Sequence, residues 1–152
     1  MEFGRAELGA PFAIEDYITH RPPILGVDRI REIGPASVVA ERLVAPGPEV
    51  GADGSLWEGA LIEGLAQTAS VLHAHAAHLE GRRVARGMLV GLNRLVFHRS
   101  VRVGERLEYR IELTRLLEPV SLMHGVACVG EEVVAEGDLK FYIEERGKEN
   151  GP

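Results

Sequence analysis

The chain has 152 residues, a length that suits one domain with a substantial core. Its hydrophobic fraction of 45% and charged fraction of 26% are typical of a folded globular protein, which excludes general disorder and a disulfide scaffold. The net charge of -6 disfavours a nucleic-acid partner, because proteins that bind a phosphate backbone usually carry a dense basic patch. We expect one domain over residues 1–152, with an ordered core from about 12 to 144.

Membrane and metal partners are disfavoured as well. No apolar run approaches the roughly 20 residues of a membrane span, and the first residues lack the layout of a signal peptide. The single cysteine, Cys128, lies in an apolar run, where a buried inert thiol is expected and fits a reducing cytoplasm. His73, His75 and His78 lack a cysteine or a second matching pair, so they predict a solvated helix end and no metal site.

The first third of the chain predicts short elements separated by turns. Residues 14–17 are compatible with a short helix, and residues 20–23 must form an extended turn because two prolines exclude a helix there. Residues 24–33 and 37–44 are β-like runs with Gly and Pro between them. A loop rich in Pro, Gly and Asp follows from 45 to 55.

A long helix is predicted from about residue 59 to about residue 79. Its apolar residues recur at spacings of three and four and extend well around the cylinder, which is typical of a buried helix. Glu63, Gln67 and Ser70 form one polar line along it. A buried carboxylate is costly, so we expect Glu63 to have a function and burial to raise its pKa toward neutrality.

The remaining residues predict antiparallel strands. Residues 107–114 and 133–143 alternate between apolar and polar side chains, and residues 88–98 and 120–129 complete the set. Gly130 lies where a hairpin would turn. The predicted fold is α+β, with one long central helix wrapped by a curved antiparallel sheet. Such a sheet has exposed edges, and joining the edges of two subunits would remove one pair of them. We therefore expect a homodimer.

Several stretches resemble one known family. These are "HRPPILGVDRI" (20–30), "IEGLAQTASVL" (62–72), "GLNRLVFHRSVRVGERLEYRIEL" (91–113) and "GEEVVAEGDLKFYI" (130–143). In this order they are similar to the signatures of the hot-dog-fold 3-hydroxyacyl-[acyl-carrier-protein] dehydratases, and the likeness covers about residues 14 to 143. The resemblance implies a hot-dog fold, a dimer with acyl chains in a tunnel between the subunits, and no cofactor.

The resemblance also implies roles for individual residues. The family's catalytic Glu falls on Glu63, and its helix Gln falls on Gln67. Its Asp-Arg pair falls on Asp28 and Arg29, which we expect to form a structural ion pair. His20 matches the signature histidine, which is not the catalytic one in the family.

The sequence departs from the family where the catalytic histidine loop should be. The interval "PEVGADGSLWEGALIE" (48–63) contains no histidine, as in a divergent branch that is encoded with polyene or specialised fatty-acid pathways. A dehydration needs a second proton-transfer group besides Glu63. The candidates to replace the missing histidine are Asp53, Glu58, His20, His98 and His124.

The leading hypothesis is a 3-hydroxyacyl thioester dehydratase of fatty-acid or polyene-type biosynthesis, with Glu63 as general acid/base and Gln67 orienting it. Trp57 and the backbone amides of Gly59 and Ala60 at the helix start should contact the substrate. Two alternatives remain: a thioesterase in which Glu63 activates water, and a non-catalytic acyl-binding subunit that pairs with an active dehydratase. The expected partners are an acyl carrier protein or coenzyme A thioester and a second subunit, in a homodimer, a higher oligomer of dimers or a heterodimer with another hot-dog protein.

Overall fold

The computed structural model of the chain describes residues 13–82 and 84–145. The two ends that we expect to lie outside the ordered core fall almost wholly outside these described residues. The first described element is the 3-10 helix η1 (Ile14–Asp16), as residues 14–17 predict.

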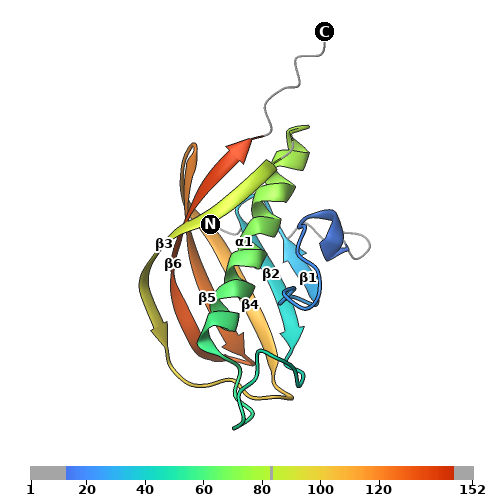
Figure 1. Cartoon of the computed structure of the whole chain (residues 1–152). Coiled ribbons are helices and arrows are strands. Elements are labelled where there is room, and N and C mark those ends of the chain that lie inside the picture. The colour runs from blue at the N-terminus through green and yellow to red at the C-terminus, as the bar shows by residue number, and fades with distance from the viewer. Residues whose placement is uncertain (1–12, 83, 146–152) are drawn as a thin grey trace.

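One long helix, α1 (Glu58–Leu79), runs along the molecule in front of a sheet (Figure 1). Trp57 precedes it in an extended conformation, and its amide donates to the Glu49 carbonyl at 2.9 Å. At the other end, Gly81 has a φ of 67°, the left-handed conformation that glycine adopts without strain, and its amide donates to a helix carbonyl. The predicted helix from about 59 to about 79 is therefore confirmed.

Six strands form a single antiparallel sheet in the order β1-β2-β4-β5-β6-β3. Their bounds are β1 (Arg29–Ile33), β2 (Ser37–Leu43), β3 (Val84–Phe97), β4 (Arg106–Leu117), β5 (Val120–Val129) and β6 (Glu132–Glu145). Gly130, with a φ of 60°, makes the predicted hairpin turn between β5 and β6. Long hairpins build the middle of the sheet, and β1 and β3 lie at its two ends.

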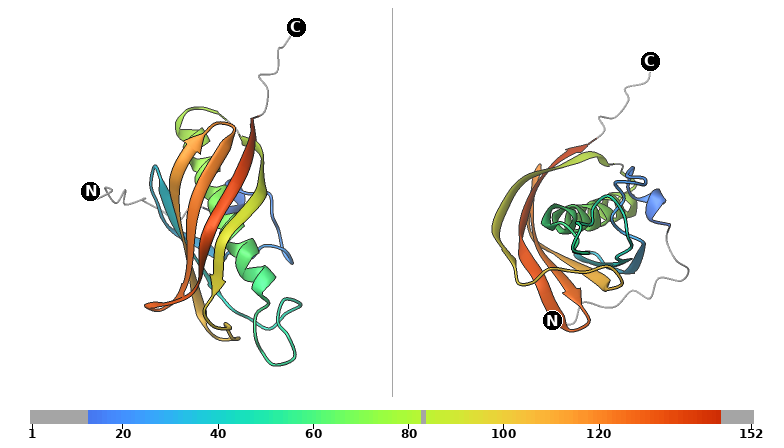
Figure 2. Two further views of the ribbon diagram at one scale, coloured as in Figure 1. Left: turned by 90° about the vertical axis from the view of Figure 1, so that its left-hand side faces the viewer. Right: turned by 60° about the horizontal axis from the view of Figure 1, so that its bottom comes forward.

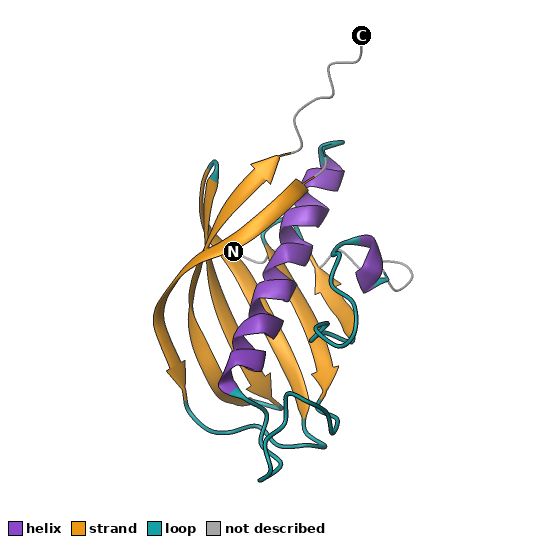
Figure 3. Cartoon of the chain, in the orientation of Figure 1, coloured by secondary structure: helices purple, strands orange, loops and turns teal. Residues whose placement is uncertain are grey.

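The sheet curves around the helix, as the view from the bottom of the molecule shows (Figure 2). Figure 3 shows the same two layers, one helix against one sheet. Leu107, Tyr109 and Ile111 of β4 alternate with exposed or half-buried neighbours and are at most 2% exposed, because they face α1. A Cβ on Gly64 of α1 would lie 2.3 Å from the Tyr109 ring, so only glycine permits this close approach. The predicted α+β architecture is confirmed.

The predicted strand over residues 24–33 is wrong in its first half. β1 begins only at Arg29, and residues 24–28 form an irregular segment that lies against α1. The reason is a competing partner, since the Gly26 amide donates to the Gln67 side chain at 2.8 Å and cannot join a strand ladder. Val27 in this segment is 1% exposed, which explains the apolar pattern that suggested a strand.

The predicted ion pair between Asp28 and Arg29 is also wrong. Asp28 accepts a hydrogen bond from the Leu43 amide at 2.7 Å, whereas Arg29 pairs with the carboxylate of Glu41 on β2. Neighbouring residues at the start of a strand point in different directions, so each finds its own partner. Both contacts tie β1 and the segment before it to β2, which agrees with the structural role expected for this motif.

The histidine-rich end of α1 is solvated only in its last residues, whereas the sequence predicts a solvated helix end that includes all three histidines. His73 Nε2 lies 2.7 Å from the hydroxyl of Ser121 on β5, and its ring packs edge-on against Phe141. His75 is half-buried beside Tyr17, and of the three histidines only His78 is exposed. The sheet extends far enough along the helix to cover this turn, which the helix sequence alone does not indicate.

Two further expectations concern Cys128 and membrane spans. Cys128 is buried at 4% exposure, as predicted, and burial raises the pKa of its thiol. In the described part of the chain, no helix is long and apolar enough to cross a membrane. The described residues also include no group of three or more His, Cys, Asp or Glu side chains placed to hold a metal ion.

Candidate functional site

The candidate site is built on the second turn of α1. Glu63 and Gln67 lie one helical turn apart, and Gln67 Nε2 donates to Glu63 Oε1 at 2.9 Å. Gln67 is only 1% exposed, and its side-chain amide makes its other hydrogen bonds to the segment before β1. Nε2 also donates to the Ile24 carbonyl, and Oε1 accepts from the Gly26 amide. A buried amide that makes all three of these hydrogen bonds can adopt only one orientation. Because Gln67 is fixed in this way, its hydrogen bond also holds Glu63 in place.

Glu63 itself is not enclosed, and the expectation of a buried carboxylate is wrong for the single chain. Its side chain is 39% exposed, because the helix face that carries it lies beside the segment 20–26 and not beneath the sheet. A bound molecule can therefore reach the carboxylate.

His20 lies opposite Glu63 within the same chain. The distance from His20 Nε2 to Glu63 Oε1 is 3.8 Å, and the His20 side chain is 34% exposed. The segment that carries His20 is fixed by Arg21, whose guanidinium donates to the carbonyls of Ile18 and His20, both at 2.8 Å. The structure therefore brings together a carboxylate and an imidazole that are 43 residues apart in the sequence.

The start of α1 contributes an accessible backbone. Trp57 is 60% exposed, and Gly59 is exposed with open space where a Cβ would project. The Ala60 amide donates to the Trp57 carbonyl at 3.0 Å, so the Gly59 amide is the better placed of the two predicted donors. The loop before the helix is held by an ion pair in which Arg42 Nη2 contacts Glu49 Oε2 at 2.5 Å. This loop thereby fixes the position of Trp57.

Three of the other four candidates for the missing histidine have local partners of their own. Asp53 caps its loop by accepting from the Ser55 amide at 3.0 Å, which holds the pKa of Asp53 below its usual range. His124 pairs with Asp138 at 2.8 Å across β5 and β6. His98 lies 3.7 Å from a glutamate of β6, and Glu58 is exposed in the first turn of α1.

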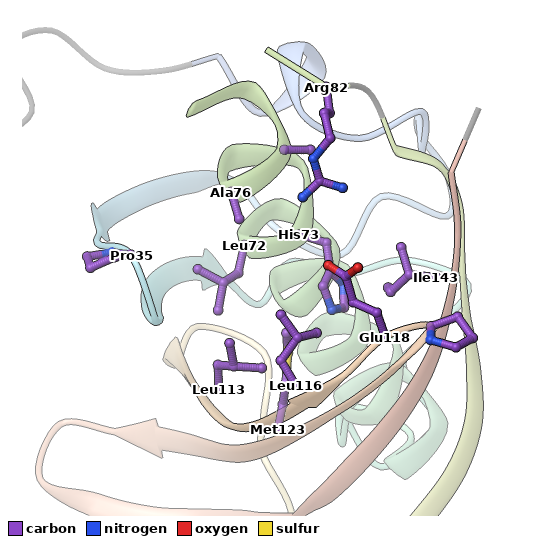
Figure 4. Close-up of a pocket in the computed structure, with 12 residues that line it drawn as sticks. Pro35, Leu72, His73, Ala76, Arg82, Leu113, Leu116, Glu118, Met123 and Ile143 are labelled. Carbon is purple, nitrogen blue, oxygen red and sulfur yellow. The ribbon is translucent and has the colours of Figure 1, made fainter. Parts of the chain in front are cut away.

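A cavity of about 430 Å³ opens at the other end of α1, between the helix and the ends of β4, β5 and β6 (Figure 4). His73, Arg82 and Glu118 give it a polar part, and the rest of its lining is largely apolar, including Leu72, Ala76, Leu113, Leu116, Met123 and Ile143. His73 follows Glu63 by ten residues, a rise of about 15 Å along a helix. Glu63 does not line this cavity. The cavity therefore does not mark the position of the candidate site.

A helix wrapped by one antiparallel sheet is the hot-dog fold, and comparison with solved structures agrees. The dehydratase heterocomplex ApeI:P from Xenorhabdus doucetiae matches with a TM-score of 0.79 and 22% identity, over 93% of this chain and 94% of that one. A hypothetical thioesterase from Streptococcus pneumoniae, solved with coenzyme A, matches with a TM-score of 0.72 and 12% identity, over 88% of this chain and 98% of that one.

Sequence comparison gives the family. The sequence profile of the ApeP-like family, described as ApeP dehydratase, matches residues 12–149. The 3-hydroxyacyl-[acyl-carrier-protein] dehydratase FabZ of Bacillus pumilus is 35% identical over 137 residues, which is 86% of this chain and 92% of that protein. The FabZ of Natranaerobius thermophilus is 32% identical over 139 residues, 88% of this chain and 96% of its own length. The chain therefore belongs to the ApeP-like dehydratase family.

Sequence reasoning placed Glu63 and Gln67 on one line of the helix, and the structure shows them in contact. It did not find the proximity of His20 to Glu63, although His20 was among the candidates. The signal was indirect: the prolines after His20 stop the chain from continuing as a strand, which leaves the segment free to turn toward the helix. The contact of His73 with Ser121 had no sequence signal.

Proposed function

We propose that this chain eliminates water from a 3-hydroxyacyl thioester, with Glu63 as a general acid/base and Gln67 as the residue that orients it. The observation that carries the proposal is a carboxylate fixed by a buried amide and open to a bound molecule. The names of the FabZ relatives support the reaction class, since they are 3-hydroxyacyl-[acyl-carrier-protein] dehydratases of about the same length.

The reaction needs three functions at the site. A base removes a proton from C2, an acid protonates the departing hydroxyl on C3, and a donor polarises the thioester carbonyl. We assign a proton transfer to Glu63 and the carbonyl contact to the Gly59 amide, because the end of a helix offers amides without intrahelical partners. The exposed indole of Trp57 would cover the apolar part of the substrate next to this end of α1. This chemistry requires no cofactor.

We propose an acyl carrier protein as the carrier, with coenzyme A as the other thioester to be tested. The carrier and its attached acyl group would approach the exposed start of α1, where Trp57 and Gly59 lie. The single cysteine, which is buried, suits a reducing compartment, so we place the reaction in the cytoplasm.

We also propose that two subunits join along β3, as a homodimer or as a heterodimer with another hot-dog protein. β3 is a long strand at the end of the sheet, and its neighbouring residues Leu89 and Val90 point to opposite faces yet are 37% and 54% exposed. Met88, Leu92 and Val96 are exposed too. An apolar strand with a free edge is a surface that a second chain would cover.

Activity assays on Glu63→Gln test the proposed function. The wild-type chain should convert a 3-hydroxyacyl carrier-protein thioester to the enoyl product, and Glu63→Gln should lower kcat/KM by about 10²- to 10⁴-fold. Glu112→Gln is the matched control, because Glu112 is an exposed glutamate on β4 that alternates with the buried Ile111 and so points away from α1, and it should keep wild-type activity.

Two results would contradict the proposal in different ways. Release of free thiol without enoyl product would identify a thioesterase. No turnover by the chain alone, together with full activity when Glu63→Gln is mixed with a second hot-dog protein, would identify a non-catalytic subunit.

A further inference from the structure

We propose that His20 is the second proton-transfer residue of this site and acts together with Glu63 of the same chain. The inference rests on the proposed dehydration and names the group that takes the place of the missing loop histidine. It is carried by the 3.8 Å distance from His20 Nε2 to Glu63 Oε1 and by the exposure of both side chains, at 34% and 39%.

The segment around His20 is built to hold the imidazole in one place. Arg21 donates to the carbonyls of Ile18 and His20, and the Arg21 carbonyl accepts from the amides of Ile24 and Leu25, both at 3.1 Å. Gln67 then ties the Ile24 carbonyl to α1 at 2.9 Å. The same Gln67 side chain orients Glu63, so one buried amide sets the position of the carboxylate relative to the imidazole.

Only one ring nitrogen of His20 is available for proton exchange. Nδ1 is buried and has no hydrogen-bond partner among the described residues, whereas Nε2 faces Glu63. Of the other groups weighed as replacements, Asp53 and His124 make direct contacts of their own, to Ser55 and to Asp138. His20 is the candidate for which the described structure shows a contact with Glu63.

The pair performs the elimination while it holds one proton in total. The unprotonated member takes the proton from C2, the electron pair of that C–H bond forms the C2–C3 double bond, and the C3–O bond breaks. The protonated member gives its proton to the departing oxygen, which leaves as water. The two proton sites belong to adjacent carbons, so the two protein groups must be neighbours, as His20 and Glu63 are. Afterwards the pair again holds one proton, on the opposite member.

Activity should therefore fall on both sides of a pH optimum. A second proton on the pair removes the base, and loss of the only proton removes the acid. His20→Gln should lower kcat/KM by about 10²- to 10⁴-fold and remove one of the two sides of the profile. His124→Gln is the control, because His124 contacts Asp138 on the sheet and should retain the wild-type profile.

A substrate with fluorine in place of the 3-hydroxyl separates catalysis from a structural role. Fluoride leaves as an anion without a proton, so the variant that lacks the acid should recover on this substrate while the variant that lacks the base should not. We expect this recovery in only one of His20→Gln and Glu63→Gln. If His20 merely supported the fold, His20→Gln would lose both substrates in the same proportion.

Further outcomes decide between the inference and the function on which it rests. Wild-type activity that needs Glu63 but is unchanged in His20→Gln overturns the inference alone. Absence of elimination by the wild-type chain, alone and with an added hot-dog partner, overturns the proposed function and the inference with it. Circular dichroism checks that His20→Gln is folded. If His20→Gln is not folded, His20→Ala takes its place, and added imidazole should restore the activity of folded His20→Ala.

Discussion

At the scale of single residues, the site depends on a polar side chain placed where an apolar one would be expected. Gln67 faces the segment before β1 from inside the fold, at 1% exposure, and its amide contacts that segment twice and Glu63 once. The polar line on the helix predicted a shared role for Glu63 and Gln67. It could not predict that Glu63 stays 39% exposed, because exposure depends on which distant segment covers that face.

Replacing Gln67 by leucine should damage stability and activity together. Gln67→Leu keeps the volume but leaves the Ile24 carbonyl and the Gly26 amide without their partner, which should lower the free energy of unfolding by about 2–4 kcal/mol. Urea unfolding measures this loss. Ser70→Ala is the control, since Ser70 donates only along its own helix, to the Ala66 carbonyl. Equal stability of the two variants would contradict the bridging role of Gln67.

Two glycines of the same helix should respond in opposite ways to alanine. In Gly64→Ala the new Cβ would lie 2.3 Å from the buried Tyr109 ring, so we expect a loss of about 1–3 kcal/mol or more. In Gly59→Ala the Cβ meets nothing within 4 Å, and the better helix former should leave stability equal or slightly higher. Thermal unfolding of both variants tests this, and a stable Gly64→Ala protein would contradict the close packing of α1 on β4.

At the scale of elements, the contact of α1 with β5 and β6 makes stability depend on pH. Burial lowers the pKa of His73 from 6.5 to about 4, because its ring lies between Ser121 and Phe141. The unfolded chain binds a proton at His73 below pH 6.5, whereas the folded chain does so only near pH 4. Stability is therefore lost as the pH falls through this window.

This pH effect has a measurable size. Between pH 7 and pH 5, His73 should account for a loss of about 2 kcal/mol in the free energy of unfolding. His73→Gln should remove that part of the pH dependence, and the exposed His78→Gln should not. Urea unfolding of both variants at the two pH values is the measurement, and identical pH dependence in wild type and His73→Gln would show that His73 is not buried.

The elements themselves were predictable to different degrees. α1 and strands such as β4 have a strong period of their own, so their positions follow from local sequence. Residues 24–28 were predicted as a strand because most of them are apolar, but their buried residues, Gly26 and Val27, lie against a helix that is about 40 residues further along the chain. An apolar run without a period indicates that a segment is buried, but it does not indicate which element covers that segment.

At the scale of the whole molecule, the exposed edge strand predicts the assembly. Val90→Glu places a charge in the apolar face of β3 and should convert the proposed dimer to single chains, because a buried unpaired charge opposes association. Light scattering after size exclusion gives the mass. Leu43→Glu is the control, since Leu43 is 46% exposed on β2, beside the other end of the sheet. An unchanged mass for Val90→Glu would exclude assembly through β3.

The sequence by itself determined the order of the elements, the buried helix and the residues Glu63 and Gln67 that lie on one line of it. These follow from period and spacing, which are local properties of the chain. Only the tertiary structure decided that His20 lies 3.8 Å from Glu63, that Glu63 stays accessible and that His73 is covered by the sheet. Each of these depends on segments that are far apart in sequence and meet only when the sheet closes around the helix.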